Sequence, residues 1–411
     1  MPVFDVAPLN LLTFTTLYPN AANPNHGVFV ENRLRHLVGS GAAASIVLAP
    51  VPYFPRLRLA TSLGRRFGWD RHAWVPAVET RHGLAVWHPR FAVIPKIGMN
   101  WAPDLLAAAA VPALRRLLDH GAKIDVIDAH YVYPDGVAAV MLARRFGLPV
   151  TITARGSDIT QLPDYKVPRR RIIAALQAAD ALIGVSAALC EAMIGLGADP
   201  ARVHVLRNGI DLAMFRPADP APARAELGLA ATDRLMVAVG HLIARKRHDL
   251  TISALPALPG THLAILGDGA ERASLAALAA RLGVAERVHL LGSRPHASLP
   301  LWYSAADVSV LASTREGWAN VLLESMACGT PVIASNIAGN PEVVQGPEAG
   351  LILRENTPDA LADAALQLAA APPDRAATRA YAERFGWQET TEGQLRVFRD
   401  VLSRRPRQDV A

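Results

Sequence analysis

Two acidic residues, Glu316 and Glu324, flank a glycine turn and the start of a predicted helix, and they point most directly to chemistry. The pattern over 308–332 predicts a buried strand, a turn, a helix that starts near Asn320, a glycine stop and a second strand. The first amides of such a helix bind phosphate or diphosphate, because unpaired N–H groups lie at the positive end of the helix dipole. Glu324 lies one turn into the helix, where a carboxylate can accept hydrogen bonds from a ribose diol. The amides expected to bind the anion are those of Asn320, Val321 and Leu322.

The same two glutamates also have an ordinary structural interpretation. Glu324 would then be a solvated helix residue, and Glu316 an acid that caps the helix start. Spacing alone does not separate the two interpretations, because two glutamates eight residues apart occur often by chance.

Short apolar runs alternate with helical patterns along most of the chain, which is typical of βαβ units and parallel sheets. The turn at 208–211 and the Pro/Ala-rich stretch after it separate two such series, so we expect two doubly wound α/β domains with a boundary near residue 209. Ligands of such sheets bind beyond the carboxyl ends of the strands, in the cleft that both domains would face. The expected strands are 10–16, 44–48, 124–128, 149–153 and 181–185 in the first series and 235–239, 263–266, 288–291, 308–311 and 331–334 in the second. The expected helices are 27–38, 104–119, 135–146 and 167–178, then 247–257, 270–282, 298–304 and 320–327.

Composition excludes several classes of protein. The 411 residues are 51% apolar and 19% charged, unlike a disordered chain, and no apolar run reaches the roughly 18 residues of a spanning helix. Asp5 argues against an export signal, two cysteines cannot form a disulfide framework, and no Cys/His pattern indicates zinc. We therefore expect a soluble protein of a reducing compartment, the cytoplasm. The net charge of +6 fits either an acidic partner or a composition rich in Ala and Arg, and no motif indicates nucleic-acid binding.

The segment 56–101 does not follow the βαβ rhythm. We expect either an insertion beside the cleft or a helix pair at the surface. Its composition fits peripheral contact with the inner face of an anionic membrane that carries a lipid-linked acceptor, and equally a packed insertion with solvated arginines. The residues that set this segment apart are Arg56, Arg58, Arg65, Arg66, Trp69, Arg71, Trp74, Trp87 and Trp101.

The stretch 316–332 resembles the Glu-x7-Glu motif of retaining glycosyltransferases of family 4 (group 1), which have the GT-B fold of two Rossmann-like domains facing a central cleft. The match includes the Glu-Gly-aromatic start and the Met-Ala-Cys-Gly-Thr-Pro-Val tail, and the resemblance covers essentially the whole chain. In this family the last helix crosses back to the N-terminal domain. The resemblance therefore implies an acceptor-binding domain of residues 1–208 plus about 386–411, and a donor-binding domain of residues 209–385. Further matches to the family are 266–269, 292–294, 306–307, 336–343 and 385–387.

For the donor site, the resemblance implies that Glu316 holds the hydroxyls of the sugar and Glu324 the ribose. It identifies Lys246 as the diphosphate-binding lysine, with Arg245 beside it as a second phosphate partner. His241 stands where the family has an arginine, so either Arg245 compensates or His241 binds as an imidazolium. A solvated helix start is the alternative for the two basic residues. The other donor-binding residues implied are Gly27, Gly240, Gly267, Gly269, Arg294, Gly317, Trp318, Asn320, Val321 and Leu322.

At the reaction centre, Arg155 stands where the family often has a histidine. An arginine cannot act as a general base, but it can stabilise a departing diphosphate or bind an acidic sugar. The resemblance implies that His130 faces the cleft near the acceptor, with a satisfied loop histidine as the alternative. Asp158 would position Arg155 or accept a hydrogen bond from the acceptor. The 19–25 loop more closely resembles members that build exopolysaccharide or teichuronic-acid-type polymers.

The resemblance implies a retaining transferase that needs neither metal nor cofactor. It would move a hexosyl group from a nucleotide-diphosphate sugar, with UDP favoured over GDP, to a glycan or lipid-linked acceptor in cell-surface polysaccharide biosynthesis. Metal-dependent transferases commonly use an Asp-x-Asp triplet, which the sequence lacks. A nucleotide-sugar epimerase of the same architecture and a non-catalytic GT-B binding protein are the rivals, and the full match of 316–331 together with Lys246 argues against both. The oligomeric state stays open.

Overall fold

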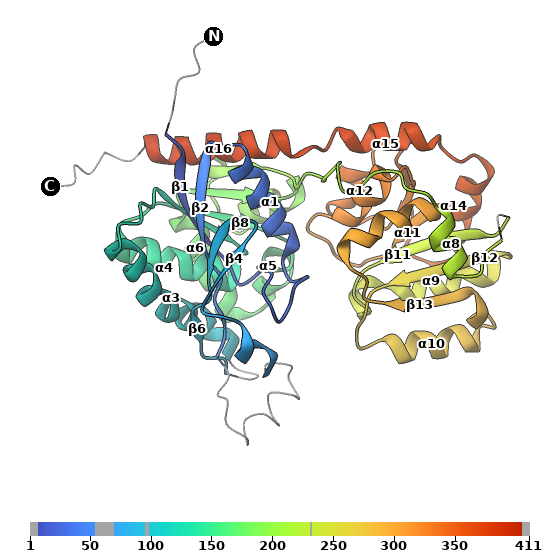
Figure 1. Ribbon diagram of the computed structural model, residues 1–411, viewed down its shortest axis with the longest axis horizontal. Helices are drawn as coiled ribbons and strands as arrows, with labels where there is room; N and C mark the ends of the chain where they lie inside the picture. The colour runs from blue at the N-terminus through green and yellow to red at the C-terminus, as the bar shows by residue number, and fades with distance from the viewer. Residues whose placement is uncertain (1–6, 54–69, 95–97, 231, 405–411) are drawn as a thin grey trace, which may run out of the picture. The chain divides into compact units, whose positions relative to one another are not determined.

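The computed structural model describes residues 7–53, 70–94, 98–230 and 232–404, and the chain divides into two compact units (Figure 1). Unit 1 comprises Met1–Arg207 with Gln388–Ala411, and unit 2 comprises Asn208–Trp387. Unit 1 is discontinuous, because the chain returns to it in the helix α16 (Trp387–Ser403).

Unit 1 is built on an eight-stranded sheet in the order β10-β9-β8-β7-β1-β2-β5-β4. Every neighbouring pair is parallel except β4 and β5. Helices α1 and α16 share an apolar cluster with the sheet, in which Leu34 and Phe398 pack with Leu11 and Val47. The strands are β1 (Leu9–Phe14), β2 (Ala43–Leu48), β4 (Val78–Arg81), β5 (Leu84–Trp87), β7 (Val126–His130), β8 (Val150–Ala154), β9 (Ala181–Gly184) and β10 (Val203–Val205). The helices named below are α1 (Val28–Gly39), α3 (Ala102–Asp119), α4 (Val137–Phe146), α6 (Lys166–Ala178) and α7 (Ala187–Gly195), and a separate pair of strands is β3 (Val51–Pro52) with β6 (Arg90–Phe91).

Unit 2 is built on a six-stranded sheet in the order β13-β12-β11-β14-β15-β16, in which every pair is parallel. Its core joins the sheet to the helices α9, α10 and α14 through residues such as Leu250, Leu275 and Leu361. The strands are β11 (Arg234–Val239), β12 (Thr261–Leu266), β13 (Val288–Gly292), β14 (Val308–Leu311), β15 (Val332–Ala334) and β16 (Gly350–Ile352). The helices are α8 (Ala221–Glu226), α9 (His248–Ala254), α10 (Arg272–Arg281), α11 (Leu299–Ala305), α12 (Asn320–Ala327), α13 (Asn340–Val343), α14 (Pro358–Ala370) and α15 (Arg375–Glu383).

The expected βαβ rhythm is present in both units. Each expected strand lies within two residues of the observed one, and the expected helix 320–327 coincides with α12. Strands β10 and β16 were not expected, because each has only three residues and gives no apolar run that periodicity could detect.

The segment 56–101 differs from both expectations. Its described part forms no helix pair and instead adds a β-hairpin to the sheet of unit 1, with β5 parallel to β2 and β4 antiparallel to β5. The physical reason is the two-residue turn His82-Gly83, where both residues have positive φ, at 48° and 80°, as a type I′ hairpin turn requires. Leu84 and Val86 alternate into the core of the unit. Of the residues that set this segment apart, Arg56, Arg58, Arg65, Arg66 and Trp69 lie outside the described residues.

Within the described residues, no helix combines the length and the apolar character that crossing a membrane would require.

Arg33 ties the returning helix α16 to unit 1. Its side chain is only 1% exposed, Nε donates to Oε1 of Gln394 at 3.0 Å, and NH1 donates to the carbonyl of Leu206 at 2.9 Å. Burial lowers the pKa of Arg33 to about 10, and Asp128 offsets part of this, so the guanidinium is charged at neutral pH. The buried charge is therefore acceptable only because acceptors surround it.

We expect Arg33→Ala to lower the free energy of unfolding by about 3 kcal/mol or more, because it leaves the buried Gln394, the Leu206 carbonyl and Asp128 without their cation. Urea unfolding followed by circular dichroism measures the loss. Arg35→Ala on the exposed side of the same helix is the matched control and should change stability by less than about 0.5 kcal/mol. Equal stabilities for the two variants would contradict this account of Arg33.

Candidate active site

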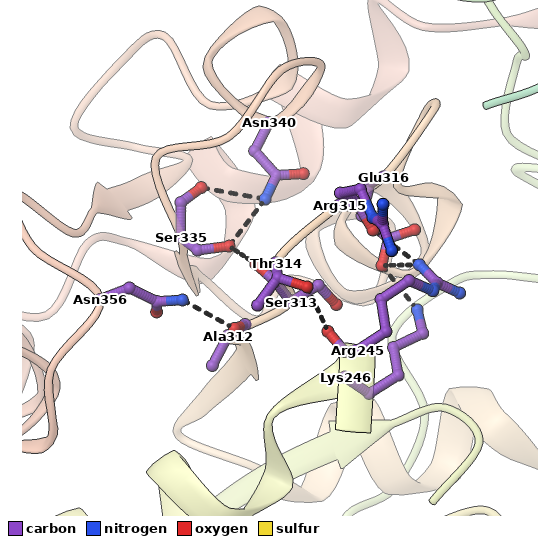
Figure 2. A network of polar contacts seen from close by, with 10 residues as sticks. All are labelled: Arg245, Lys246, Ala312, Ser313, Thr314, Arg315, Glu316, Ser335, Asn340 and Asn356. Atoms are coloured by element: carbon purple, nitrogen blue, oxygen red, sulfur yellow. Dashed lines mark hydrogen bonds and ion pairs between the residues drawn. The ribbon is translucent and has the colours of Figure 1, made fainter. Parts of the chain in front are cut away.

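Glu316, Lys246 and Arg245 form an ion cluster beyond the carboxyl ends of β11 and β14 (Figure 2). The two strands are parallel neighbours, so the loops that follow them meet at the same edge of the sheet. Lys246 Nζ donates to Glu316 Oε1 at 2.8 Å, and Arg245 NH1 lies 3.2 Å from the same oxygen. Arg245 NH1 also donates to the carbonyl of Arg315 at 2.6 Å. The structure thus brings together three of the predicted catalytic residues from segments about 70 positions apart.

The cluster keeps Glu316 ionised. Burial alone would raise the pKa of this carboxyl, whose side chain is 11% exposed, but the charges of Lys246 and Arg245 outweigh burial and lower the pKa. A carboxylate at this place accepts hydrogen bonds and can bind hydroxyl groups. One carboxylate faces two cations, so the cluster carries a net charge of about +1 and suits an anionic ligand.

Glycines let the loops after β11 and β12 touch each other. A Cβ on Gly267 would lie 1.9 Å from the carbonyl oxygen of Gly240, and a Cβ on Gly269 would lie 2.3 Å from that of Leu242. A Cβ on Gly240 would lie 3.3 Å from Cε of Lys246, so the missing side chain leaves room for the lysine. These contacts explain the glycines by packing, and their direct contact with a donor stays a prediction.

Two of the three amides expected to bind an anion are already used inside the turn. The amide of Asn320 donates to the carbonyl of Trp318 at 3.1 Å, and that of Leu322 donates to the carbonyl of Ala319 at 3.0 Å. The prediction that all three amides are free was therefore wrong for these two, because the first turn of α12 closes onto the residues just before it. Anion binding by the amide of Val321 stays a prediction.

Trp318, a predicted donor-binding residue, lies inside the unit, and its contact with a donor stays a prediction. Its ring is buried and packs against Phe385, with the ring centroids 6.2 Å apart. The preceding Gly317 is buried too, and its carbonyl oxygen lies 2.9 Å from the place of a Cβ on Gly339. Both residues shape the turn from inside the unit rather than presenting a side chain to a ligand.

Glu324 is held by two side chains that the sequence did not point to. Oε2 accepts a hydrogen bond from the Tyr303 hydroxyl at 3.0 Å, and Oε1 lies 3.1 Å from Nε2 of His296. The edge of the Phe215 ring packs against His296 at 5.1 Å between centroids. Burial lowers the pKa of His296, but the hydrogen bond and charge of Glu324, with Asp211, outweigh burial and raise it. The carboxylate is only 7% exposed, which excludes the interpretation of Glu324 as a solvated helix residue.

The two remaining predicted donor residues of unit 2 lie on loops around the cluster. Arg294 forms an ion pair with Glu226 of α8, and its guanidinium lies 5.5 Å from the ring centre of Trp302. His241 is exposed on the loop after β11. The structure gives no contact between Arg294 and the ion cluster among the described residues, so its place beside a nucleotide base stays a prediction.

In unit 1, Arg155 and His130 meet at the carboxyl ends of β8 and β7. Arg155 NH2 donates to Nδ1 of His130 at 2.7 Å, and its guanidinium lies 5.5 Å from the ring centre of Phe29. His130 is 1% exposed and its Nε2 lies 3.2 Å from Oδ2 of Asp128. The prediction that His130 faces the acceptor was therefore wrong, because both ring nitrogens are engaged inside the unit.

The acceptor-binding role predicted for Asp158 was wrong as well. Its buried carboxylate accepts hydrogen bonds from the backbone amides of Val132, Arg155 and Gly156 at 2.7 to 3.1 Å. These three amides come from two loops, so Asp158 ties the loop after β7 to the loop after β8. It positions the backbone of Arg155, which was its other predicted role.

Gly27 has a packing reason of its own. It precedes α1 with φ at 73°, and a Cβ there would lie 2.2 Å from the carbonyl oxygen of Leu17. Only glycine combines this conformation with this close approach. Contact with a donor phosphate is a separate matter and stays a prediction.

Comparison with known proteins decides the family. Residues 221–385 match the family described as glycosyl transferases group 1, and residues 57–214 match glycosyltransferase family 4. A D-inositol 3-phosphate glycosyltransferase of Xylanimonas cellulosilytica is 32% identical over 356 residues, which cover 80% of this chain and 85% of that protein. One of Segniliparus rotundus is 31% identical over 326 residues, covering 73% and 72%. The chain is a group 1 glycosyltransferase of family 4.

Solved structures confirm the predicted fold of this glycosyltransferase. Sucrose-phosphate synthase of Thermosynechococcus elongatus superposes with a TM-score of 0.78 at 21% identity, covering 96% of this chain and 99% of that one. Anabaena HepE in complex with UDP superposes with a TM-score of 0.71 at 20% identity, covering 96% and 100%. Both have the GT-B fold, and units 1 and 2 are its two Rossmann-like domains.

Polar side chains hold the loop that carries Glu316 in the glycosyltransferase, and one of them, Asn340, lies in the 336–343 segment that matches the family (Figure 2). Ser335 Oγ donates to the carbonyl of Ser313 at 2.6 Å, and Asn340 Nδ2 donates to the carbonyl of Ser335 at 3.0 Å. On the other side of the loop, Asn356 Nδ2 donates to the carbonyl of Ala312 at 3.1 Å. For Ser335, the sequence showed only that a polar residue follows directly after the apolar strand β15.

We expect Asn340→Ala to lower the turnover of the glycosyltransferase about 10- to 100-fold, because the loop under Glu316 loses a buried support and misplaces the carboxylate. Asn336→Ala, four residues earlier and exposed, is the matched control and should turn over like the wild type. Thermal midpoints of both variants separate a misplaced loop from an unfolded protein. If Asn340→Ala turned over as fast as the control, Asn340 would not be needed to hold the loop that carries Glu316.

Proposed function

We propose that this glycosyltransferase moves a hexosyl group, with retention of the anomeric configuration, from a nucleotide-diphosphate sugar to a hydroxyl group of an anionic acceptor. The observation that carries the proposal is the cluster of Glu316, Lys246 and Arg245, in which one ionised carboxylate stands between two cations. It offers a hydroxyl-binding group and a diphosphate-binding group within 3.2 Å of each other. UDP is favoured over GDP, since the structurally similar HepE was solved with UDP.

The reaction breaks the bond between the anomeric carbon and the diphosphate oxygen, and forms a bond from the anomeric carbon to the acceptor oxygen on the same face. Negative charge grows on the leaving diphosphate while the sugar ring becomes cationic. Lys246 and Arg245 stabilise the leaving charge, and the amide of Val321 adds a donor at the start of α12. Glu316 accepts hydrogen bonds from the sugar hydroxyls and fixes the ring. The leaving phosphate takes the proton of the acceptor hydroxyl, so no side chain has to act as a base.

Arg155 and the names of the relatives support an anionic acceptor. The relatives of about 32% identity are called D-inositol 3-phosphate glycosyltransferases, a name that contains a phosphorylated polyol. Arg155 stands beyond the carboxyl end of β8 and presents a planar, charged group that suits phosphate or carboxylate. We place a phosphorylated small polyol first. A glycan or lipid-linked acceptor of cell-surface polysaccharide synthesis at the inner face of the cytoplasmic membrane is second, on the resemblance of the 19–25 loop.

A thermal-shift panel of nucleoside diphosphates tests the donor half, because a ligand that binds the folded state alone raises the unfolding midpoint. We expect UDP to raise the midpoint more than GDP or ADP. An assay of transfer from UDP-hexoses to D-inositol 3-phosphate tests the acceptor. Activity with EDTA present tests metal independence, and NMR of the product tests retention of the anomeric configuration. Absence of stabilisation by every nucleoside diphosphate would refute the donor site.

We expect Glu316→Gln to lower turnover by orders of magnitude while the midpoint shift given by UDP stays nearly unchanged. The amide lacks the charge that holds hydroxyls in the transition state, whereas Lys246 and Arg245 still bind the diphosphate. Initial rates and UDP thermal shifts measure the two effects. Glu355→Gln, a surface glutamate of the same unit, is the control. Normal turnover in Glu316→Gln would contradict the role of Glu316 in holding the sugar hydroxyls.

The membrane contact predicted for 56–101 stays a proposal, supported by exposed aromatic rings in the described part. Trp74 is 75% exposed and Trp101 is 49% exposed, and indole rings favour the membrane interface. We expect Arg65→Glu/Arg66→Glu and Trp74→Ser to reduce co-sedimentation with vesicles that contain anionic lipid, the first most strongly at low salt. Reversing the adjacent exposed pair Arg144 and Arg145 on α4 is the matched control. Absence of co-sedimentation would exclude the membrane contact, and binding that ignores both salt and the 65/66 reversal would exclude an electrostatic contact through Arg65 and Arg66.

A further inference from the structure

We propose that Asp128 and His130 are positioning residues that aim the guanidinium of Arg155 at the anionic group of the acceptor. The inference rests on the proposed function and extends it to side chains that do not themselves touch the substrate. It gives His130 a role in place of the predicted acceptor contact, and it adds Asp128, for which the sequence indicated no role.

The three residues form one chain of contacts across neighbouring strands. Asp128 and His130 are two positions apart on β7, so their side chains leave the same face of the strand. Asp128 Oδ2 lies 3.2 Å from His130 Nε2, and His130 Nδ1 lies 2.7 Å from Arg155 NH2 at the end of the adjacent β8. The hydroxyl of Thr151 donates to the other Asp128 oxygen at 3.2 Å. The carboxylate is thus fixed on one side while it faces the imidazole on the other.

The contacts fix the tautomer of His130. A guanidinium donates hydrogen bonds and cannot accept them, so Nδ1 of His130 must be the acceptor. The ring proton is then on Nε2, which faces the Asp128 carboxylate. Asp128 therefore selects the one neutral form of His130 that can hold Arg155.

The surrounding charges favour this neutral form. Burial lowers the pKa of His130 to about 4, Asp128 opposes the shift, and Arg155 and Arg33 add to it. These are the charged groups that face the ring, from β7, from the loop after β8 and from α1. A second proton on His130 would place an N–H against the guanidinium and break the hydrogen bond. The hydrogen bond that aims Arg155 should therefore persist at neutral pH and be lost as the pH falls through about 4.

Arg155 is held at several points. Its backbone amide donates to Asp158, and its guanidinium lies over the ring of Phe29. Burial lowers its pKa, and the nearby charge of Arg33 lowers it further, while Asp128 and Asp158 offset only part of this. An anion bound beside the guanidinium would favour its charged form, as the charges of Asp128 and Asp158 do. A guanidinium that is held in one position suits phosphate, carboxylate or sulfate as a ligand.

Inorganic sulfate is the probe for the test, because its charge stays the same between pH 4 and 8. Its dissociation constant is measured by calorimetry for the full-length wild type and for variants. The part of the binding that Arg155→Met removes belongs to unit 1, so sulfate held by Lys246 and Arg245 does not enter the comparison. If Arg155→Met removes no binding, Arg155 is no anion receptor and the inference fails, whereas stabilisation by UDP still reports on the proposed function separately.

The His130 variants separate positioning from packing. We expect His130→Leu to weaken the Arg155-dependent sulfate binding tenfold or more, because the guanidinium loses a hydrogen bond made by a charged group. His130→Asn places an oxygen acceptor near the position of Nδ1 and should bind sulfate within about threefold of the wild type. Asp128→Asn, which no longer selects the tautomer, should lie between them. Unfolding midpoints show whether each variant is folded at the temperature of the titration.

The pH profile is the result that a purely structural role would not produce. In the wild type, the Arg155-dependent binding should stay constant down to about pH 5 and fall as the pH approaches 4, because His130 gains its proton near that pH, whereas in His130→Asn it should stay flat. With a phosphorylated acceptor, His130→Leu should raise KM and leave kcat nearly unchanged. Equal weakness of the Leu and Asn variants, or identical pH profiles of Asn and wild type, would overturn the inference.

Discussion

The ion cluster of Glu316 with Lys246 and Arg245 depends on a constraint of parallel sheets. Residues about 70 positions apart meet because β11 and β14 are neighbours and their following loops leave the sheet at the same edge. Burying a carboxylate costs several kcal/mol. A unit charge 4 Å away returns about 4 kcal/mol at an effective dielectric constant of 20. Two cations at 2.8 and 3.2 Å therefore outweigh the cost, in agreement with the lowered pKa of Glu316.

The arrangement also explains why the surrounding loops are so constrained. The lysine reaches the carboxylate past Gly240, where a side chain would crowd it, and the loop after β12 closes on the backbone of the loop after β11. On the far side, Ser335 and Asn340 hold the backbone of Ser313. None of these groups need touch a ligand. Their common effect is to keep the ion cluster in one geometry. The entropy cost of ordering its side chains is therefore met during folding and does not recur when substrate binds.

Sequence reasoning predicted the two sheets, their strands and the residues of the ion cluster, because these depend on periodicity and on a motif that is local in the chain. Sequence reasoning failed for residues whose role depends on contacts between segments that are distant in the chain. Asp158 looked like a free carboxylate until the fold brought three backbone amides to it. Tyr303 and His296 gave no signal, since only the packing of α11 and the loop after β13 against α12 brings them to Glu324. The hairpin β4–β5 was missed because arginines and tryptophans around it hid an ordinary two-residue turn.

Glu324 is part of the fold and is also the residue proposed to bind the ribose. Each carboxylate oxygen can accept two hydrogen bonds, and in this structure Tyr303 uses one site on Oε2 while His296 faces Oε1. One acceptor site on each oxygen therefore remains, which matches the two hydroxyls of a ribose. If His296 is protonated, which its raised pKa favours, it draws charge from Oε1 and leaves Oε2 the stronger acceptor. The proposed ribose contact would then be asymmetric, with the hydroxyl on Oε2 bound more tightly than its neighbour.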